Sequence, residues 1–159
     1  MLFRSKTIEK ANLFMNTTRY GIIGCGSMGR EHIENIKAMG GACVTALADT
    51  HGPSLQAALA LIDPGPAVFS DHCELLASGL CDAVVIATPN FTHAAILRDA
   101  LATDLHILVE KPLVTNIDDG LDLVQSAQGR KGIVWVAQEY RYMPPVAEMI
   151  RLVHAGVAG

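Results

Sequence analysis

The chain has 159 residues, half of them apolar, and a formal net charge of −4. This length allows one substantial hydrophobic core, and the scattered Lys and Arg residues form none of the basic patches with which proteins bind nucleic acids. The longest apolar runs, such as residues 83–87, are too short to cross a bilayer. Neither a nucleic acid nor a membrane is therefore predicted as a partner.

The cysteines lie far apart in the sequence, with no C-x-x-C pair: Cys25, Cys43, Cys73 and Cys81. Their neighbours are apolar, so we expect reduced thiols in a cytoplasmic protein and predict no metal site. Residues 1–18 carry three basic residues but lack the long apolar stretch of a secretory signal. A disordered extension is the simpler interpretation of this segment, and an organelle-targeting segment is the alternative.

From Arg19 onward, β-rich runs alternate with segments of helical apolar spacing. Strands are predicted at residues 20–23, 43–48, 67–69, 82–87, 106–109 and 133–137. Helices are predicted at residues 28–39, 54–62, 73–77, 93–102, 117–127 and 146–154. The alternation implies right-handed βαβ units, so the predicted fold class is α/β, a doubly wound parallel sheet of the Rossmann type over residues 19–140. Residues 141–159 are predicted to be a connecting helix that begins a truncated second domain.

The run Gly24-Cys25-Gly26-Ser27-Met28-Gly29 follows the first predicted strand with the spacing G-x-G-x-x-G, and its residues are predicted cofactor contacts. In a dinucleotide site, Gly24 permits the tight turn, Gly26 lets backbone amides approach the pyrophosphate, and Gly29 lets the helix pack closely. The helix N-terminus then favours the negative charge of the pyrophosphate. A tight turn without a ligand is the alternative, because glycine triplets also arise by chance.

Asp49 ends the second predicted strand, about 20 residues after the glycines, as dinucleotide sites require. Its carboxylate can accept hydrogen bonds from both hydroxyls of the adenosine ribose and would repel a 2′-phosphate. The next residues are Thr50 and His51, with no Arg, so NAD is favoured over NADP as the cofactor. The alternative is a turn former at a strand end, before Gly52-Pro53.

The loop after the fourth predicted strand should also reach the carboxyl edge of the sheet, where open parallel sheets bind ligands. Predicted cofactor contacts in it are Thr88, Pro89, Asn90 and His93. A helix cap is the alternative for Asn90, and a packing position in the first helical turn is the alternative for His93.

The fifth predicted strand runs into Glu110-Lys111-Pro112 at the same edge. The Lys111 ammonium could orient a hydroxyl or carbonyl group and stabilise charge on its oxygen during hydride transfer. Lys111 is therefore the predicted catalytic residue. An exposed Lys paired with Glu110 is the alternative.

These motifs, in this order, together with Glu139-Tyr140-Arg141-Tyr142-Met143-Pro144-Pro145, resemble the N-terminal half of the glucose-fructose oxidoreductase and inositol dehydrogenase (Gfo/Idh/MocA) family. The resemblance implies a domain that binds NAD or NADP, with Lys111 near nicotinamide and substrate. It also implies that Glu110 meets the ribose region of the cofactor and that Arg141 reaches cofactor or substrate. The implied reaction oxidises a hydroxyl group of a sugar, polyol or cyclic alcohol, with hydride transfer to the nicotinamide.

Members of that family continue into an α/β domain that supplies most substrate contacts. We therefore expect the nucleotide-binding half of an oxidoreductase, which would act on a small polyol or sugar only together with the missing domain. A non-catalytic NAD(H)-binding or regulatory module is the alternative. Val146, Ile150 and Val153 recur at helical spacing, so the last helix is predicted to mediate self-association.

Overall fold

The computed structural model describes residues 17–157, so the expectation for residues 1–16 lies outside the described range. Six strands form one sheet in the order β3-β2-β1-β4-β5-β6, and every neighbouring pair is parallel. They are β1 (Thr18–Ile23), β2 (Ala42–Ala48), β3 (Ala67–Phe69), β4 (Ala83–Ile86), β5 (His106–Val109) and β6 (Val134–Val136). The predicted doubly wound parallel sheet is confirmed.

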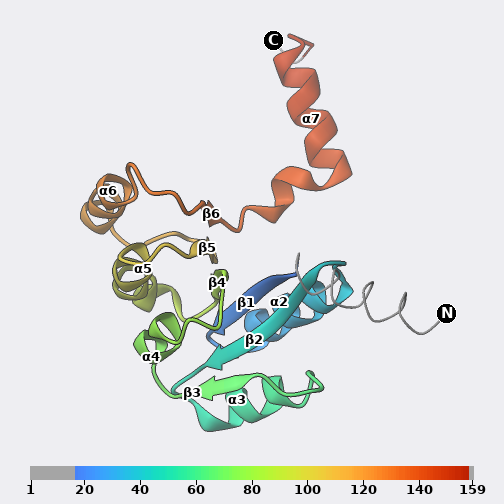
Figure 1. The fold of residues 1–159 in the computed structure, drawn as a ribbon. Coiled ribbons are helices and arrows are strands. Elements are labelled where there is room, and N and C mark those ends of the chain that lie inside the picture. Colours follow the sequence, from blue (N-terminus) through green and yellow to red (C-terminus); the bar gives the residue numbers. More distant parts are fainter. Residues whose placement is uncertain (1–16, 158–159) are drawn as a thin grey trace, which may run out of the picture.

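Helices cover both faces of this sheet (Figure 1). On one face lie α2 (Ser27–Ala38) and α3 (Gly52–Leu59), and on the other lie α4 (His72–Ala77), α5 (His93–Leu101) and α6 (Ile117–Ser126). Two of the predicted helix starts have side-chain caps, because Asp71 accepts a hydrogen bond from Cys73 N–H and Asn116 accepts one from Asp119 N–H. By contrast, α3 begins at Gly52, earlier than predicted, because Pro53 fits the first turn of a helix.

Each face of the sheet has its own core. Ile33 of α2 and Leu55 of α3 pack on the face to which Ile22 and Leu47 point, whereas Leu97 of α5 packs with residues of the opposite face. Strand β4 is buried along its whole length, as expected for a central strand covered on both sides. The apolar runs of the sequence are therefore explained by burial inside one domain.

Strand β1 begins at Thr18, before the predicted start at Tyr20 and one residue inside the segment interpreted as an extension. Arg19 belongs to the strand because it pairs with Cys43 of β2. Its backbone N–H also donates to Asp82 Oδ2 at 2.9 Å, and its guanidinium pairs with the same carboxylate at 2.7 Å. The Arg19 hydrogen bonds lower the pKa of Asp82 below its usual value. This partner is 63 residues away in the sequence, so no local pattern indicates it.

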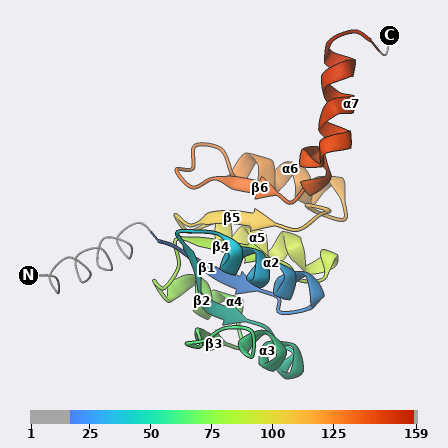
Figure 2. The same ribbon diagram turned by 90° about the vertical axis from the view of Figure 1, so that its right-hand side faces the viewer.

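After β6 the chain continues through a 3₁₀ turn, η2 (Glu139–Tyr142), into α7 (Pro144–His154). Helix α7 projects away from the sheet in both views (Figures 1 and 2), and none of its residues is buried. On its predicted apolar side, Val153 is 54% accessible, and Val146 and Ile150 are half-buried; Met149 of the same helix is 58% accessible. Within residues 17–157, no helix has the length and apolar character that crossing a membrane requires.

Candidate functional site

A cavity of about 620 Å³ opens at the carboxyl edge of the sheet. Its walls include the turn between β1 and α2, the end of β2 and the loop after β4. Strands β1 and β4 are neighbours although they are far apart in sequence. From β1 the chain adds strands toward one edge of the sheet, and from β4 it adds them toward the other edge, so the strand order reverses between these two strands. Open α/β sheets bind ligands at this reversal.

The glycines of the turn have three different environments. Gly24 has φ +94°, and a Cβ there would lie 2.6 Å from the carbonyl oxygen of Ala87. A Cβ at Gly29 would overlap the carbonyl oxygen of Gly24, so only glycine lets α2 approach the turn this closely. At Gly26, which lines the cavity, a Cβ would meet nothing within 4 Å. The protein therefore leaves space beside the Gly26 backbone that a ligand can occupy.

Within the described part of the chain, helix α2 starts at this space without a side-chain cap. Among residues 17–157, no side chain caps the helix at Gly26 and no acidic residue lies in its first turn. The first N–H groups of a helix lack partners within the helix and carry partial positive charge. A phosphate group fits this helix start as a ligand.

Asp49 connects the end of β2 with the glycine turn. Its Oδ2 accepts a hydrogen bond from Cys25 N–H at 2.6 Å, and its Oδ1 accepts one from His51 N–H at 2.8 Å. Asp49 also lines the cavity, so its carboxylate is held in place by two backbone donors while it faces the space for a ligand. The remaining lone pairs can accept further hydrogen bonds from ligand hydroxyl groups.

Cys25 is fully buried beside this carboxylate. Burial first, and then the charge of Asp49, raises the pKa of its thiol to about 12. The side chain is therefore a protonated packing group, and only its backbone N–H contributes to the site.

A second acid lies at the end of β5. Glu110 is 7% exposed, its Oε1 is 2.9 Å from His32 Nε2 of α2, and its Oε2 accepts a hydrogen bond from Lys111 N–H at 3.1 Å. The Glu110 carboxylate is thus fixed between a helix and its own strand end, while the Lys111 side chain is exposed. The alternative of a Lys111–Glu110 ion pair is not seen among the ion pairs of residues 17–157.

His93 lies where its alternative interpretation placed it, as a packing residue in the first turn of α5. It is fully buried, with Nδ1 2.8 Å from the Pro112 carbonyl oxygen and Nε2 3.0 Å from the Thr88 carbonyl oxygen. It therefore connects the loop after β4 with the loop after β5 and does not line the cavity. Asn90 begins the short helix η1 (Asn90–Thr92) and caps neither η1 nor α5.

The structure divides the predicted site residues into two sets. Residues that line the cavity are Gly24, Gly26, Ser27, Met28, Asp49, Thr88 and Pro89. Residues outside its lining are Cys25, Gly29, Asn90, His93, Glu110, Lys111 and Arg141. Arg141 lies exposed on η2, beyond β6.

Sequence reasoning did not identify His32 as a partner of Glu110, nor His72 and Phe91 as part of the cavity lining. His32 had a signal, because it follows Gly29 by one helical turn and so shares its face of α2. Phe91 also had a signal, because it lies in the loop that was predicted to reach the carboxyl edge. His72 had none, because only the strand order brings the segment after β3 to the cavity.

The comparisons with known proteins agree with this geometry. Residues 18–138 match a family model described as "Oxidoreductase family, NAD-binding Rossmann fold" (GFO_IDH_MocA). An inositol 2-dehydrogenase from Pseudarthrobacter chlorophenolicus is 42% identical over 120 residues, which are 74% of this chain and 35% of that relative. An inositol 2-dehydrogenase from Mycolicibacterium smegmatis is 33% identical over 146 residues, which are 91% of this chain and 42% of that relative.

Solved structures show the same architecture. The myo-inositol dehydrogenase from Lactobacillus casei, in complex with NAD(H) and myo-inositol, has a TM-score of 0.84 at 28% identity, and the match covers 90% of this chain and 43% of that one. The WlbA dehydrogenase from Bordetella pertussis, in complex with NADH and UDP-GlcNAcA, has a TM-score of 0.81 at 28% identity, covering 88% and 42%. The chain thus spans less than half the length of the relatives that it matches.

Proposed function

Because the chain belongs to the Gfo/Idh/MocA oxidoreductase family, we propose that it binds NAD(H) in the cavity between the glycine turn and Asp49, for hydride transfer to or from a cyclic polyol. The observation that carries this proposal is the pair formed by Gly26 and Asp49. Gly26 leaves open space at an uncapped helix start, and Asp49 places a carboxylate at the end of β2. When bound, the nicotinamide supplies the hydride chemistry.

The charge of the cavity supports a proposed preference for NAD over NADP. Asp49 offers free lone pairs to the two ribose hydroxyls, and its negative charge repels a 2′-phosphate. Of the described residues that line the cavity, none is Lys or Arg, so nothing permanently cationic offsets this repulsion. We therefore propose NAD as the cofactor.

For the chemical step we propose Lys111 as the residue that orients the substrate hydroxyl. The carboxylate next to it is occupied by His32 and by the Lys111 backbone N–H, so the exposed ammonium is available to a substrate oxygen. An ammonium there stabilises negative charge that develops as the hydroxyl loses its proton. Asn90, His93 and Glu110 are proposed to position the loops around the cofactor, and Arg141 to reach cofactor or substrate.

The substrate class comes from the relatives, two of which are named inositol 2-dehydrogenases. We propose an inositol-like cyclic polyol. Further substrate contacts are proposed to come from a region that corresponds to the unmatched part of those relatives. Residues 141–159 are proposed to connect the nucleotide-binding domain to that region. On this basis the 159-residue polypeptide binds nucleotide and shows little polyol oxidation by itself.

The test is a fluorescence titration of the purified chain with NADH and with NADPH. Asp49→Asn keeps the shape and an acceptor oxygen but removes the charge, and Asp104→Asn is the matched control because Asp104 is exposed and outside the cavity lining. We expect tighter binding of NADH by the parent chain and a smaller preference in Asp49→Asn, with no change in the control. Binding of neither nucleotide by folded protein would refute the proposed site. An unchanged preference in Asp49→Asn would refute the role of its charge.

A further inference from the structure

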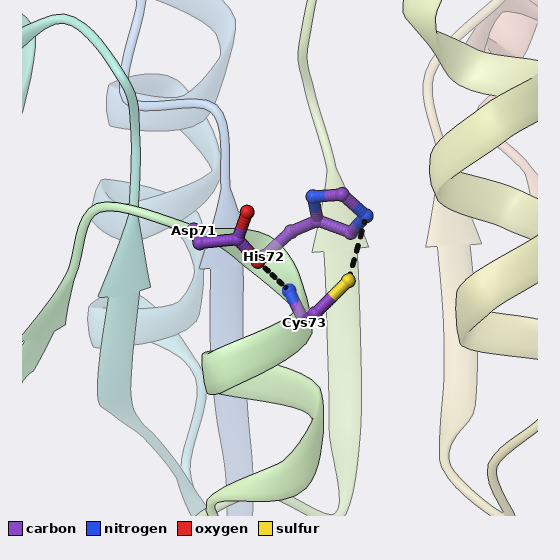
Figure 3. A group of neighbouring side chains, drawn as sticks. All are labelled: Asp71, His72 and Cys73. Atoms are coloured by element: carbon purple, nitrogen blue, oxygen red, sulfur yellow. Dashed lines mark hydrogen bonds between the residues drawn. The ribbon is translucent and has the colours of Figure 1, made fainter.

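At the edge of the cavity, three side chains with metal-binding atoms converge between α4 and α5. His72 Nε2 lies 2.8 Å from Asp99 Oδ2, Cys73 Sγ lies 3.5 Å from His72 Nε2, and Cys73 Sγ lies 3.8 Å from Asp99 Oδ2. Figure 3 shows the Cys73 sulfur facing the ring nitrogen of His72, with Asp71 beside them. A carboxylate oxygen of Asp71 lies within 4.8 Å of both the sulfur and a ring nitrogen of His72.

We propose that this group binds one divalent transition-metal ion of the zinc class, with His72, Cys73 and Asp99 as ligands. In zinc sites, metal–sulfur distances are about 2.3 Å and metal–nitrogen and metal–oxygen distances about 2.0–2.2 Å. Tetrahedral angles then separate the ligand atoms by roughly 3.3–3.6 Å. The distances from Cys73 Sγ to His72 Nε2 and to Asp99 Oδ2 are close to this spacing. For an ion to replace the hydrogen bond between His72 Nε2 and Asp99 Oδ2, these two atoms need to move apart only slightly.

The ligand chemistry selects the class of ion. A thiolate and an imidazole prefer zinc-like ions over magnesium or calcium, and a carboxylate completes a mixed set that zinc accepts. Asp71 uses Oδ1 to accept the Cys73 N–H at 2.6 Å, so it fixes the Cys73 backbone and adds negative charge. The partial positive charge at the N-terminus of α4 slightly disfavours a bound cation. The negative charges of the two carboxylates and the thiolate oppose this effect.

The same geometry argues against a nucleophilic thiol as the purpose of this group. In a Cys–His–Asp arrangement, one ring nitrogen accepts the thiol proton while the other donates to the carboxylate. Here one nitrogen, Nε2 of His72, faces both Cys73 and Asp99. The three groups therefore surround one point, as ligands do, and do not form a relay.

The location gives the proposed ion two consequences. It would tie the start of α4 to α5, because Asp99 comes from α5 and the other two ligands from α4. It would also lie at the edge of the nucleotide cavity, because His72 lines that cavity. The His72 and Asp99 side chains are 24% and 49% exposed, so an ion can enter from solvent and complete its coordination with water.

The test uses the 159-residue chain without nucleotide, so its outcome is independent of the dinucleotide proposal. Zn²⁺ affinity is measured by competition with a chromophoric chelator. Co²⁺ is added separately, because a sulfur ligand gives a thiolate-to-metal charge-transfer band. The variants are Cys73→Ser, His72→Asn and Asp99→Asn. Cys43→Ser, on β2, is the matched control, and circular dichroism verifies that each variant is folded.

We expect one Zn²⁺ per parent chain and a cobalt–thiolate band that Cys73→Ser abolishes and Cys43→Ser preserves. His72→Asn and Asp99→Asn should each weaken Zn²⁺ binding by at least the roughly 10- to 100-fold that loss of an outer-shell partner alone causes. The proposal is overturned if the parent chain gives no cobalt–thiolate band. It is also overturned if Zn²⁺ affinity is the same in the folded Cys73→Ser, His72→Asn or Asp99→Asn variants as in the parent chain.

Discussion

Substitution by Ala should have different effects at the two glycines Gly26 and Gly29 at the start of α2, on ligand binding at the first and on folding at the second. At Gly26 an added Cβ meets no protein atom within 4 Å, and the backbone has φ −65° and ψ −162°, an extended conformation. At Gly29 an added Cβ overlaps the carbonyl oxygen of Gly24. Gly26→Ala should therefore impair nucleotide binding without unfolding the protein, whereas Gly29→Ala should impair folding.

The magnitudes follow from these contacts. For Gly26→Ala, the loss of a favoured helix-start residue and the lower entropy of the unfolded chain offset each other, so stability should change by less than about 1 kcal/mol. The methyl group would displace a charged group from backbone donors that contribute about 1.5–3 kcal/mol each, a loss of roughly 10- to 150-fold in affinity. For Gly29→Ala, forcing the turn away from α2 should cost about 1–3 kcal/mol or more.

Two measurements separate these effects. Thermal unfolding should give Gly26→Ala the Tm of the parent chain to within a few degrees, and should lower the Tm of Gly29→Ala by roughly 3–12 °C. NADH titration below both transitions should show weaker binding by Gly26→Ala. If Gly26→Ala binds NADH as well as the parent, or loses as much stability as Gly29→Ala, the assignment of the open space to the pyrophosphate is wrong.

Three further predictions concern other parts of the molecule. Arg19 lowers the pKa of Asp82, so this pair should stabilise the fold at pH values above the unfolded-state pKa of about 3.9. The stabilisation should be lost as the pH falls through the lower folded-state pKa. The free energy of unfolding in urea should therefore be lower for Asp82→Asn than for the parent at neutral pH, and the two values should converge in acid. Buried Cys25, with its pKa near 12, should be alkylated far more slowly than exposed Cys73, and equal labelling by mass spectrometry would contradict its burial. The full chain should show a higher association state than a chain lacking residues 143–159, because α7 exposes apolar side chains; sedimentation equilibrium gives each mass relative to its own monomer, and the same association state for both chains would rule out self-association through α7.

The strand and helix pattern could be predicted because it depends on neighbours in the sequence. Apolar runs bounded by turn residues predicted all six strands in chain order, and five of them, all but β1, differ by at most one residue at either end. The helix starts predicted near residues 73 and 117 are equally local, because their caps Asp71 and Asn116 bond to amides two or three residues away. The largest error is at Thr18, where pairing with β2 extends β1 by two residues.

The placement of the candidate site at the carboxyl edge could also be predicted, since it follows from parallel strands alone. The environment of each side chain could not. His93 and Lys111 both follow strands that end at this edge, yet one is fully buried between two loops and the other is exposed. Their difference depends on how η1 and the loop after β5 pack, which sequence spacing does not determine.

By itself, the sequence determined the alternation of elements, the glycine turn and the acid that follows the second strand, because these features depend on periodicity and on the backbone freedom of glycine. Only the tertiary structure decided which distant groups meet. Asp49 accepts from Cys25, and Glu110 lies against His32, because β1 adjoins both β2 and β4 and β5 follows β4. The strand order is set by burial of the whole sheet between two helical layers, so contacts across it are properties of the assembled fold.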